Sequence, residues 1–551
     1  MIAIRALFTV VIGAPVLIGV VLTLGLALGW QPGLGQFDPG IDAFAQALSL
    51  PGFATSLRLS LVTGLGATLG ALGVSLPLGL WLIGRAGAAR YLSPLLAVPH
   101  AALAIGLGFL LAPSGWAVRL ISPWATGWDL PPDVVTVGDP WGLVLILGLM
   151  LKEVPFLLLA TLIAAGPRDV AGQMATGRSL GYSRAQVWRL IIWPQLYPAL
   201  RLPVLIVLGF SLSVVDMALV LGPSNPPVLA VQILRLFSAP DPEQARPAAA
   251  LAVILLGIMG LCLLGWLGAE RAVATLGRHW LRRGRRIRQK QSLSGPFLAI
   301  LGLMLGGGSL VILGLWSVAA FWRFPDALPP GISLSRWQAA DWAHPALSSL
   351  GLAAASTAIA MILSLIWLET EDRLARPMRL GWLIVMPLLL PQIGFLQGLT
   401  TGFLWLGLPP GPVAVIWAQL LFVFPYVMIA LTGPWRALDP GLTASAASLG
   451  AGPMRRLFRV KLPVLSAPLM TAAAIGVAVS VAQYLAVLLP GAGRVPALAT
   501  EAVALASGAD RRLTAITALM QAVLPLAAYL LALALPLWLH RNRRGLRGGL
   551  T

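Results

Sequence analysis

Five ionisable residues stand inside long apolar stretches of this 551-residue chain: Arg58, Lys152, Glu153, Arg201 and Asp216. A charge at membrane depth is costly, so it normally faces other protein groups or a water-filled path. These residues therefore indicate either ion pairs between helices or contacts with a polar solute. The two carboxylates would suit a cation and the two arginines an anion, so the sequence leaves the charge of such a solute open.

Other residues that commonly do chemistry form no recognisable set. A phosphate-binding loop needs a lysine directly after a glycine, because the lysine and the backbone N–H groups together hold the phosphates. None of the three lysines, at positions 152, 290 and 461, follows a glycine. The four histidines are scattered, and Cys262 is the only cysteine. The sequence therefore predicts a chain that is not an enzyme and that holds no metal or cofactor of its own.

The composition indicates that most of the surface faces lipid. Apolar residues make up 58% of the chain and charged residues 10%, which leaves too little polar surface for a water-soluble globule. Apolar runs long enough to cross a bilayer recur along the whole length. The predicted fold is an all-α polytopic membrane protein, with spans at 6–29, 56–83, 92–112, 141–165, 194–221, 247–268, 297–321, 346–368, 380–406, 412–432, 463–489 and 513–539.

The net charge of +19 follows the expected topology. With Met1 in the cytoplasm and the spans alternating in direction, most of the 38 lysines and arginines fall on the cytoplasmic side, as the positive-inside rule requires. Both termini are then cytoplasmic. The basic balance therefore predicts contact with a lipid bilayer rather than with nucleic acid.

Proline motifs recur between the two halves of the chain. Residues 94–99 read Pro-Leu-Leu-Ala-Val-Pro, and residues 387–391 read Pro-Leu-Leu-Leu-Pro. A proline in the middle of the fourth span, Pro155, has a counterpart at Pro425 in the tenth. Six spans per unit give both copies the same orientation. The predicted organisation is a first unit at 1–270, a basic cytoplasmic linker at 271–294 and a second unit at 295–551.

Two cytoplasmic loops carry the same pattern, one in each half. The first reads Ala-Thr-Gly-Arg-Ser-Leu-Gly at 175–181 and Ile-Ile-Trp-Pro at 191–194. The second reads Ala-Ser-Ala-Ala-Ser-Leu-Gly at 444–450 and Val-Lys-Leu-Pro at 460–463. Nine residues separate the two parts in both loops. Matched spacing at matched places in a repeat indicates a shared role.

Each loop is predicted to be a helix-turn-helix. The glycine that ends each seven-residue segment can stop a helix by taking the left-handed conformation. Ser183 and Gln186 form a capping box for the second helix of the first loop, while Gly452 and Pro453 provide a cap and a first-turn proline in the second. Both second helices are amphipathic, so either alone could lie on the bilayer surface. Their occurrence as a matched pair favours a common docking role.

This pattern of small residues, a glycine, nine further residues and a final aliphatic-X-Leu-Pro segment resembles the coupling loop of type I ABC importer permeases. The resemblance covers nearly the whole chain, and two fused units of this length are similar to the permeases for iron(III), thiamine and related solutes. The family usually opens the loop with Glu-Ala-Ala, whereas Ala175 and Ala444 stand at the acidic position here. Trp193 replaces the usual leucine.

The resemblance implies a permease subunit in a bacterial inner membrane that gives alternating access to a solute delivered by a periplasmic solute-binding protein. Its coupling loops would dock onto two separate ATPase subunits, which bind the ATP. The implied coupling residues are Ala175, Thr176, Gly177, Ser179, Leu180, Gly181, Ile191 and Pro194 in the first loop, and Ala444, Ser445, Ala446, Ser448, Leu449, Gly450, Val460, Leu462 and Pro463 in the second.

The resemblance also implies that the fifth helix helps to line the solute cavity, which makes Asp216, together with Glu153, a candidate for the translocation pathway. The alternative for Asp216 is an ion pair with Arg201 or another basic residue that holds the helices together.

Two other classes of protein stay open from the sequence. A secondary transporter of the major facilitator type also has six plus six parallel spans. It would carry an Asp-Arg motif between spans two and three, but residues 84–90 contain no acidic residue. A polytopic membrane enzyme lacks the catalytic cluster that it would need.

Overall fold

The computed structural model describes residues 2–31, 36–85, 97–166, 168–282, 294–374, 376, 378, 380–508 and 510–542. In chain order its helices, strands and short 3-10 or π segments (η) are α1 (Ile2–Phe8), η1 (Thr9–Gly13), α2 (Ala14–Ala27), β1 (Trp30–Gln31), β2 (Gln36–Phe37), α3 (Asp42–Ser49), α4 (Phe53–Leu82), α6 (His100–Leu111), α7 (Trp116–Arg119), α8 (Leu143–Ala165), α9 (Val170–Ser179), α10 (Arg184–Val187), η3 (Trp188–Ile192), α11 (Trp193–Ser213), α12 (Asp216–Leu221), α13 (Leu229–Phe237), η4 (Pro242–Gln244), α14 (Ala245–Arg282), α15 (Ser294–Val318), α16 (Ser335–Ala339), α17 (Ala343–Leu374), α18 (Gly381–Leu389), α19 (Gln392–Trp405), α20 (Pro412–Arg436), α21 (Pro440–Ser448), α22 (Pro453–Arg456), η5 (Leu457–Lys461), α23 (Leu462–Val464), α24 (Ser466–Ala482), α25 (Leu485–Gly491), α26 (Leu498–Ala506) and α27 (Arg511–Leu539).

Membrane-length helices dominate the structure. Ten helices in the described part of the chain are long and apolar enough to cross a membrane, and two bent pairs bring the number to as many as twelve. The bent pairs are α18 with α19, at 108°, and the segment from Pro453 to Val464 with α24, at 78°. The prediction of an all-α polytopic membrane protein is confirmed.

Two predicted spans are wrong at their C-terminal ends. The fifth and eleventh are predicted at 194–221 and 463–489, but the backbone becomes extended at Val214 (ψ 136°) and at Gln483 (ψ 115°). The separate short helices α12 and α25 follow these breaks. The sequence stays apolar through both breaks, so hydropathy carries no signal for them.

The proline motifs mark a second kind of break. Pro99 and Pro391 are extended (ψ 152° and 120°) and directly precede α6 and α19, in agreement with the poor fit of proline within a helix. In the second half this proline lies at the 108° bend, so the predicted span at 380–406 is two helices. Residues 94–96 of the first motif lie outside the described part of the chain.

The first membrane helix of each predicted unit packs against the other unit. Helix α2 lies against α19, and α15 lies against α6. Glycines allow both close approaches: a side chain at Gly398 would overlap the carbonyl oxygen of Gly19, and one at Gly106 would overlap that of Ser309. Gly106 and Gly398 are 292 residues apart, the same offset as Pro99 and Pro391. The division into two units stays a prediction, and these contacts fit it.

Helix α14 changes the expected linker. It continues without interruption to Arg282, so the first part of the predicted linker at 271–294 is helical. The remaining basic run, 283–293, lies outside the described residues.

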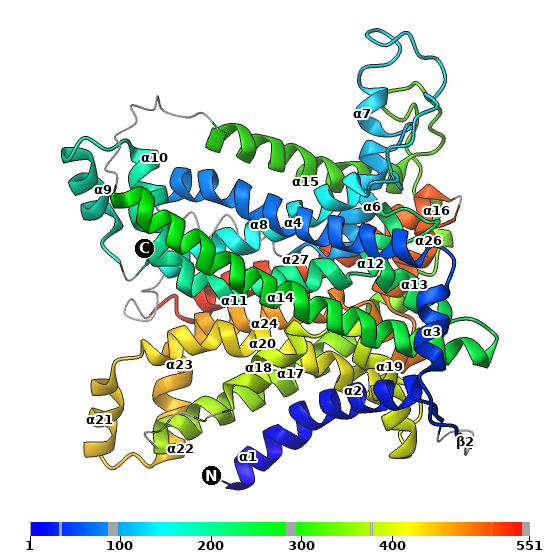
Figure 1. The fold of residues 1–551 in the computed structure, drawn as a ribbon. Coiled ribbons are helices and arrows are strands. Elements are labelled where there is room, and N and C mark those ends of the chain that lie inside the picture. Colours follow the sequence, from blue (N-terminus) through cyan, green and yellow to red (C-terminus); the bar gives the residue numbers. More distant parts are fainter. Residues whose placement is uncertain are drawn as a thin grey trace.

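Figure 1 shows how the ends of the bundle differ. The segments α9–α10 and α21–α22 lie at its left end, whereas α3, α16 and α26 lie at its right end. The two loops with the shared sequence pattern therefore project from the same end of the molecule.

Candidate functional site

The two loops have the same backbone. Gly181 and Gly450 are left-handed (φ +87° and +81°). Each glycine donates its N–H to the carbonyl three residues before it (2.9 Å in both loops), and the next residue donates to the carbonyl five residues before it (3.1 and 3.0 Å). This arrangement satisfies the last carbonyls of α9 and α21 and reverses the chain at once.

The predicted caps of the second helices are confirmed. In loop 1 the Ser183 hydroxyl accepts from the Gln186 N–H at 3.3 Å, and the Ser183 N–H donates to Gln186 Oε1 at 3.2 Å. In loop 2 Gly452 is the N-cap and Pro453 the first helical residue. Different residues therefore produce the same turn.

A π-helical segment follows in both loops, η3 in the first and η5 in the second. Pro194 and Pro463 lack the N–H that would bond the carbonyls of Leu190 and Arg459, four residues earlier, and both of those carbonyls lie in the π segments. The final proline of the shared pattern thus sets how the loop helix joins α11 or α23.

The structure places the coupling residues implied by the sequence as follows. In loop 1, Ala175, Thr176, Gly177 and Ser179 are in α9, Leu180 and Gly181 in the turn, Ile191 in η3 and Pro194 in α11; in loop 2, Ala444, Ser445, Ala446 and Ser448 are in α21, Leu449 and Gly450 in the turn, Val460 in η5, and Leu462 and Pro463 in α23.

Loop 1 is fixed to the end of α4 by a residue that the sequence pattern did not single out. Trp188 is buried and donates from Nε1 to the Leu76 carbonyl at 2.9 Å. Arg184 donates to the Leu80 carbonyl at 3.1 Å. A side chain at Gly177 would clash with Val187, so this glycine lets α9 lie directly against α10. Loop 1 therefore rests on apolar packing and bonds to backbone carbonyls.

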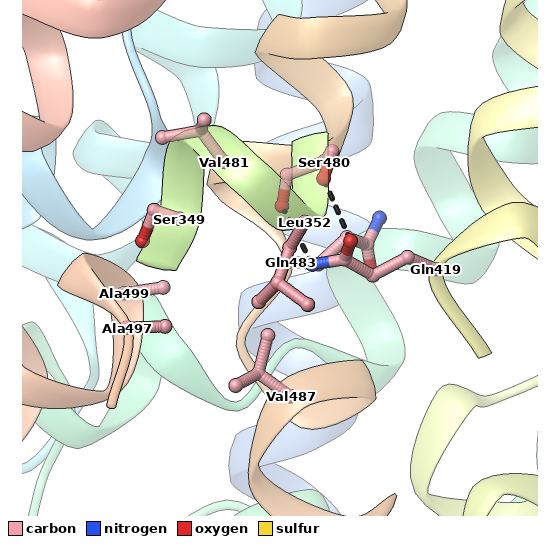
Figure 2. Close-up of a pocket in the computed structure, with 9 residues that line it drawn as sticks. All are labelled: Ser349, Leu352, Gln419, Ser480, Val481, Gln483, Val487, Ala497 and Ala499. Atoms are coloured by element: carbon pink, nitrogen blue, oxygen red, sulfur yellow. Dashed lines mark hydrogen bonds between the residues drawn. The ribbon is translucent and has the colours of Figure 1, made fainter. Parts of the chain in front are cut away.

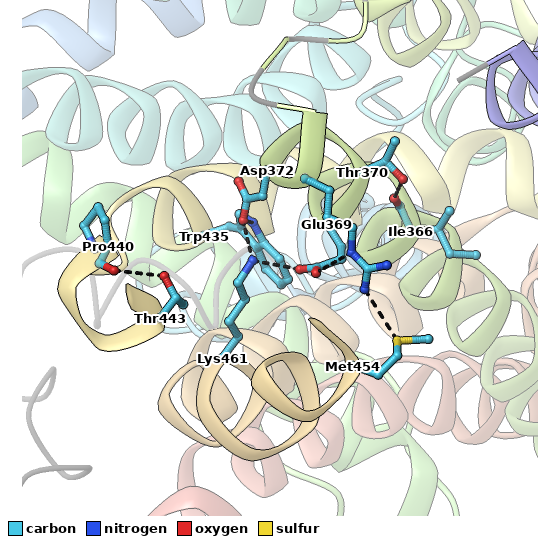
Figure 3. Close-up of polar contacts among 10 residues, drawn as sticks. Ile366, Glu369, Thr370, Asp372, Trp435, Pro440, Thr443, Met454 and Lys461 are labelled. Atoms are coloured by element: carbon cyan, nitrogen blue, oxygen red, sulfur yellow. Dashed lines mark hydrogen bonds and ion pairs between the residues drawn. The ribbon is translucent and has the colours of Figure 1, made fainter. Parts of the chain in front are cut away.

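Loop 2 is fixed differently, to the end of α17. Lys461, at the end of η5, contacts the carboxylates of Glu369 and Asp372, as Figure 3 shows. In the sequence, Lys461 is considered only because no glycine precedes it, which excludes a phosphate-binding loop there. A signal for the pairing was present, because an acidic Glu-Thr-Glu-Asp segment at 369–372 directly follows the eighth predicted span.

The candidate pathway residues lie in the buried interior. Lys152 donates from Nζ to the Val98 carbonyl at 2.5 Å and interacts electrostatically with Glu153 and Asp216. Three further residues interact electrostatically with this group: His100 with Lys152 and, from the second half, Tyr426 with Glu153 and Tyr484 with Asp216. Lys152 therefore interacts both with Glu153, its neighbour in the chain, and with Asp216, and the two carboxylates interact with tyrosines of the second half.

Arg201 is not the partner of Asp216, so only that part of the alternative is wrong. An interaction of Asp216 with another basic residue remains open, because Asp216 and Lys152 interact electrostatically. The Nε of Arg201 lies 2.7 Å from Oε2 of Glu270, in α14. Arg58 lies over the Trp141 ring, 5.4 Å from the ring centroid. The acidic partner of Arg201 lies beyond the predicted spans, next to the predicted linker, which is why sequence reasoning did not pair them.

A narrow polar pocket lies within the second half (Figure 2). The Ser480 hydroxyl donates to Gln419 Oε1 at 2.8 Å, and Gln419 Nε2 donates to the Ser480 carbonyl at 3.3 Å. Gln483, at the break between α24 and α25, also lines the pocket. In the first half, Leu149 and Val214 occupy the positions that match the two glutamines. The first half therefore contributes charged side chains to the interior, whereas the second half contributes the amide side chains of Gln419 and Gln483.

Within the described ranges, no group of three histidine, cysteine, aspartate or glutamate side chains could hold a metal ion.

The comparison with known proteins decides the family. No protein-family model matches the chain. The chain is 33% identical over 458 residues to the inner membrane ABC transporter permease protein YnjC of Escherichia coli strain K12, and the match covers 82% of each protein. The chain belongs to the ABC transporter permease family. As such a permease, it is a transport subunit of an inner membrane, and the family implies ATPase partner subunits. The major facilitator alternative is therefore wrong.

Proposed function

We propose that this permease is the membrane subunit of an importer that takes a small solute from a periplasmic solute-binding protein. Two fused units of the iron(III)- and thiamine-type group form its halves, and the path between them opens alternately to either side. Two separate ATPase subunits bind and hydrolyse the ATP, and this chain holds no cofactor.

The observation that carries the proposal is the matched pair of loops. Two helix-turn-helix segments, 269 residues apart in sequence, share a backbone and project from one end of the bundle. Both turns expose a leucine, Leu180 at 55% and Leu449 at 88%. Exposed apolar side chains at equivalent tips suit docking to a partner. Two equivalent docking loops suit two ATPase subunits, one for each loop.

We assign the end of the bundle that carries both loops to the cytoplasm, together with both chain termini. The excess of arginine and lysine in these segments agrees with that orientation. The basic residues then lie at the cytoplasmic face of the bilayer, which accounts for the net positive charge without a nucleic-acid partner.

The proposed pathway passes the group around Lys152. Asp216 begins α12 at the break after α11, and Tyr484 stands at the corresponding break before α25. A relative movement of the halves changes the surroundings of these side chains, so a solute bound there has different affinities in the two states. Such a difference is what allows the ATPase to drive transport.

Co-purification tests the docking role. The tagged permease, co-expressed with its cognate ATPase subunit, is expected to retain the ATPase, and Leu180→Asp or Leu449→Asp is expected to weaken retention because a charge enters an apolar contact. Leu130→Asp is the matched control, since Leu130 is 78% exposed and lies outside both loops. Full retention by the Leu180→Asp/Leu449→Asp double variant would contradict the proposal.

Reconstitution tests the direction and the energy source. Proteoliposomes are loaded with ATP and ATPase on the loop side, and the binding protein carrying its co-purified ligand is added to the other side. We expect uptake only when all three components are present. Uptake driven by a proton gradient without the ATPase would exclude an ABC importer.

A further inference from the structure

Lys461 is a buried cation at the end of loop 2. Its side chain is 9% exposed, and its Nζ lies 2.7 Å from Glu369 Oε2 and 2.6 Å from Asp372 Oδ2 (Figure 3). The same Nζ is 5.0 Å from the centroid of the Trp435 ring. Burying an unpaired ammonium group costs a large free energy of desolvation. The buried position of Lys461 therefore depends on these carboxylates.

One turn of α17 holds both ends of the loop 2 helix. At the start of that helix, Met454 Sδ lies 3.5 Å from Nη2 of Arg373, whose Nε donates to Glu369 Oε1 at 2.9 Å. At its end stands Lys461. Asp372 also accepts from Trp435 Nε1, in α20, at 2.9 Å. The loop helix, α17 and α20 are therefore joined through a few adjacent charged groups.

Loop 1 is joined to its half by other means. Ile192 occupies the position that matches Lys461, and residues 80–85 at the end of α4 contain no acidic residue. Its anchor is Trp188, which packs on α4 and bonds the Leu76 carbonyl. The two loops thus share a backbone but join their halves through different chemistry.

Helix α17 leads from this charged group to the polar pocket of the second half. The hydroxyl of Ser356, near the middle of α17, donates to the Ser480 hydroxyl at 3.3 Å. Ser349 lines the pocket (Figure 2), and its hydroxyl accepts from the N–H of Leu498, the first residue of α26, at 2.9 Å. A displacement of α17 along its axis therefore reaches groups deep in the membrane.

We propose that Lys461 is the positioning residue that makes α17 follow loop 2 when an ATPase moves that loop. This inference rests on the proposed docking role of loop 2. A movement that separated Lys461 from Glu369 and Asp372 would leave its buried ammonium group without a carboxylate partner, so loop 2 and α17 move together. In the first half, the packing of Trp188 against α4 makes α4 follow loop 1 in the same way.

A distance measurement across the two halves tests the inference. The complete permease, in a Cys262→Ser background, is placed in lipid nanodiscs with its cognate ATPase and labelled at Ala54→Cys and Leu347→Cys, exposed positions near the starts of α4 and α17. Double electron–electron resonance then compares the nucleotide-free complex with the complex trapped by ATP and vanadate. Lys461→Met is expected to lose about half or more of the distance change while the ATPase stays bound, and Lys461→Arg is expected to retain the change.

Controls separate this role from a structural one. Arg201→Met removes the cation of the Arg201–Glu270 pair in the first half and is expected to leave the distance change intact. If Lys461→Met does not fold, Asp372→Asn removes the more exposed carboxylate and is expected to reduce the change. If Lys461→Met folds, or if Asp372→Asn is used in its place, a distance change of full size in that variant would overturn the inference. Failure of the parent complex to bind the ATPase or to respond to vanadate would instead overturn the proposed function.

Discussion

Gly106 in α6 lies directly against Ser309 in α15, so closely that a methyl group on Gly106 would overlap the Ser309 carbonyl oxygen. The matching glycine of the other half, Gly398 in α19, has the same relation to Gly19 in α2. In lipid, helices associate mainly through close packing, because the lipid tails are as apolar as the side chains. These two contacts therefore join the halves to each other.

Gly106→Ala and Gly398→Ala are each expected to destabilise the protein by about 1–3 kcal/mol, because an added methyl group in a well-packed contact forces the helices apart. Thermal unfolding of the detergent-purified protein, followed by tryptophan fluorescence, measures the effect. Gly257→Ala in α14 is the control, since a side chain there has no neighbour within 4 Å. An unfolding temperature equal to that of the control would show that the contact has no such role.

The turn glycines make a second prediction. Gly450 is left-handed, and a β-carbon added to it would meet no atom within 4 Å, so Gly450→Ala tests the backbone conformation alone. We expect a loss of roughly 1–2 kcal/mol, the cost of a left-handed residue with a β-carbon. Gly452→Ala, at φ −64° and equally open, is expected to cost less. Thermal unfolding and ATPase co-purification report the outcome, and equal effects of the two substitutions would argue against the turn.

Trp188 is expected to fix loop 1 to α4. Trp188→Ala leaves a cavity and removes the bond to the Leu76 carbonyl, so we expect a loss of about 3–5 kcal/mol in stability. Trp188→Phe keeps most of the packing and is expected to cost less. Trypsin digestion from the loop side measures the result. The side chains of Arg178, Arg184 and Arg189 are already exposed, and a released loop 1 lets the protease bind the extended backbone around them. Unchanged digestion of Trp188→Ala would show that other contacts hold the loop.

Asp216→Asn tests the pathway. Removing this charge changes the electrostatic surroundings of Lys152 and Tyr484, and we expect uptake and solute affinity to fall about tenfold or more, as for the loss of a charged hydrogen bond. Asp241→Asn, at an exposed cap, is the matched control. Uptake in cells is compared with the amount of folded protein found by gel filtration. Normal uptake by a folded Asp216→Asn protein would remove Asp216 from the pathway.

Several features could be predicted from the sequence because they depend on neighbours in the chain. A run of apolar residues sets a membrane span wherever it packs. Ser183 and Gln186 form their capping box across three residues, and Gly450 ends a helix by its own conformational freedom. The matched spacing of the two loops was sufficient for the resemblance to an ABC permease, and the relative in Escherichia coli then showed the family.

Other features depend on contacts between residues far apart in sequence. The breaks at Val214 and Gln483 interrupt apolar runs, so hydropathy could not locate them. Lys461 is 92 residues from Glu369, and only the packing of loop 2 on α17 makes them partners. The sequence by itself determined the spans, the turns and the duplicated loops, because each is set by local chain properties. Only the tertiary structure decided which buried charges meet, since an ion pair forms wherever packing brings two charges together.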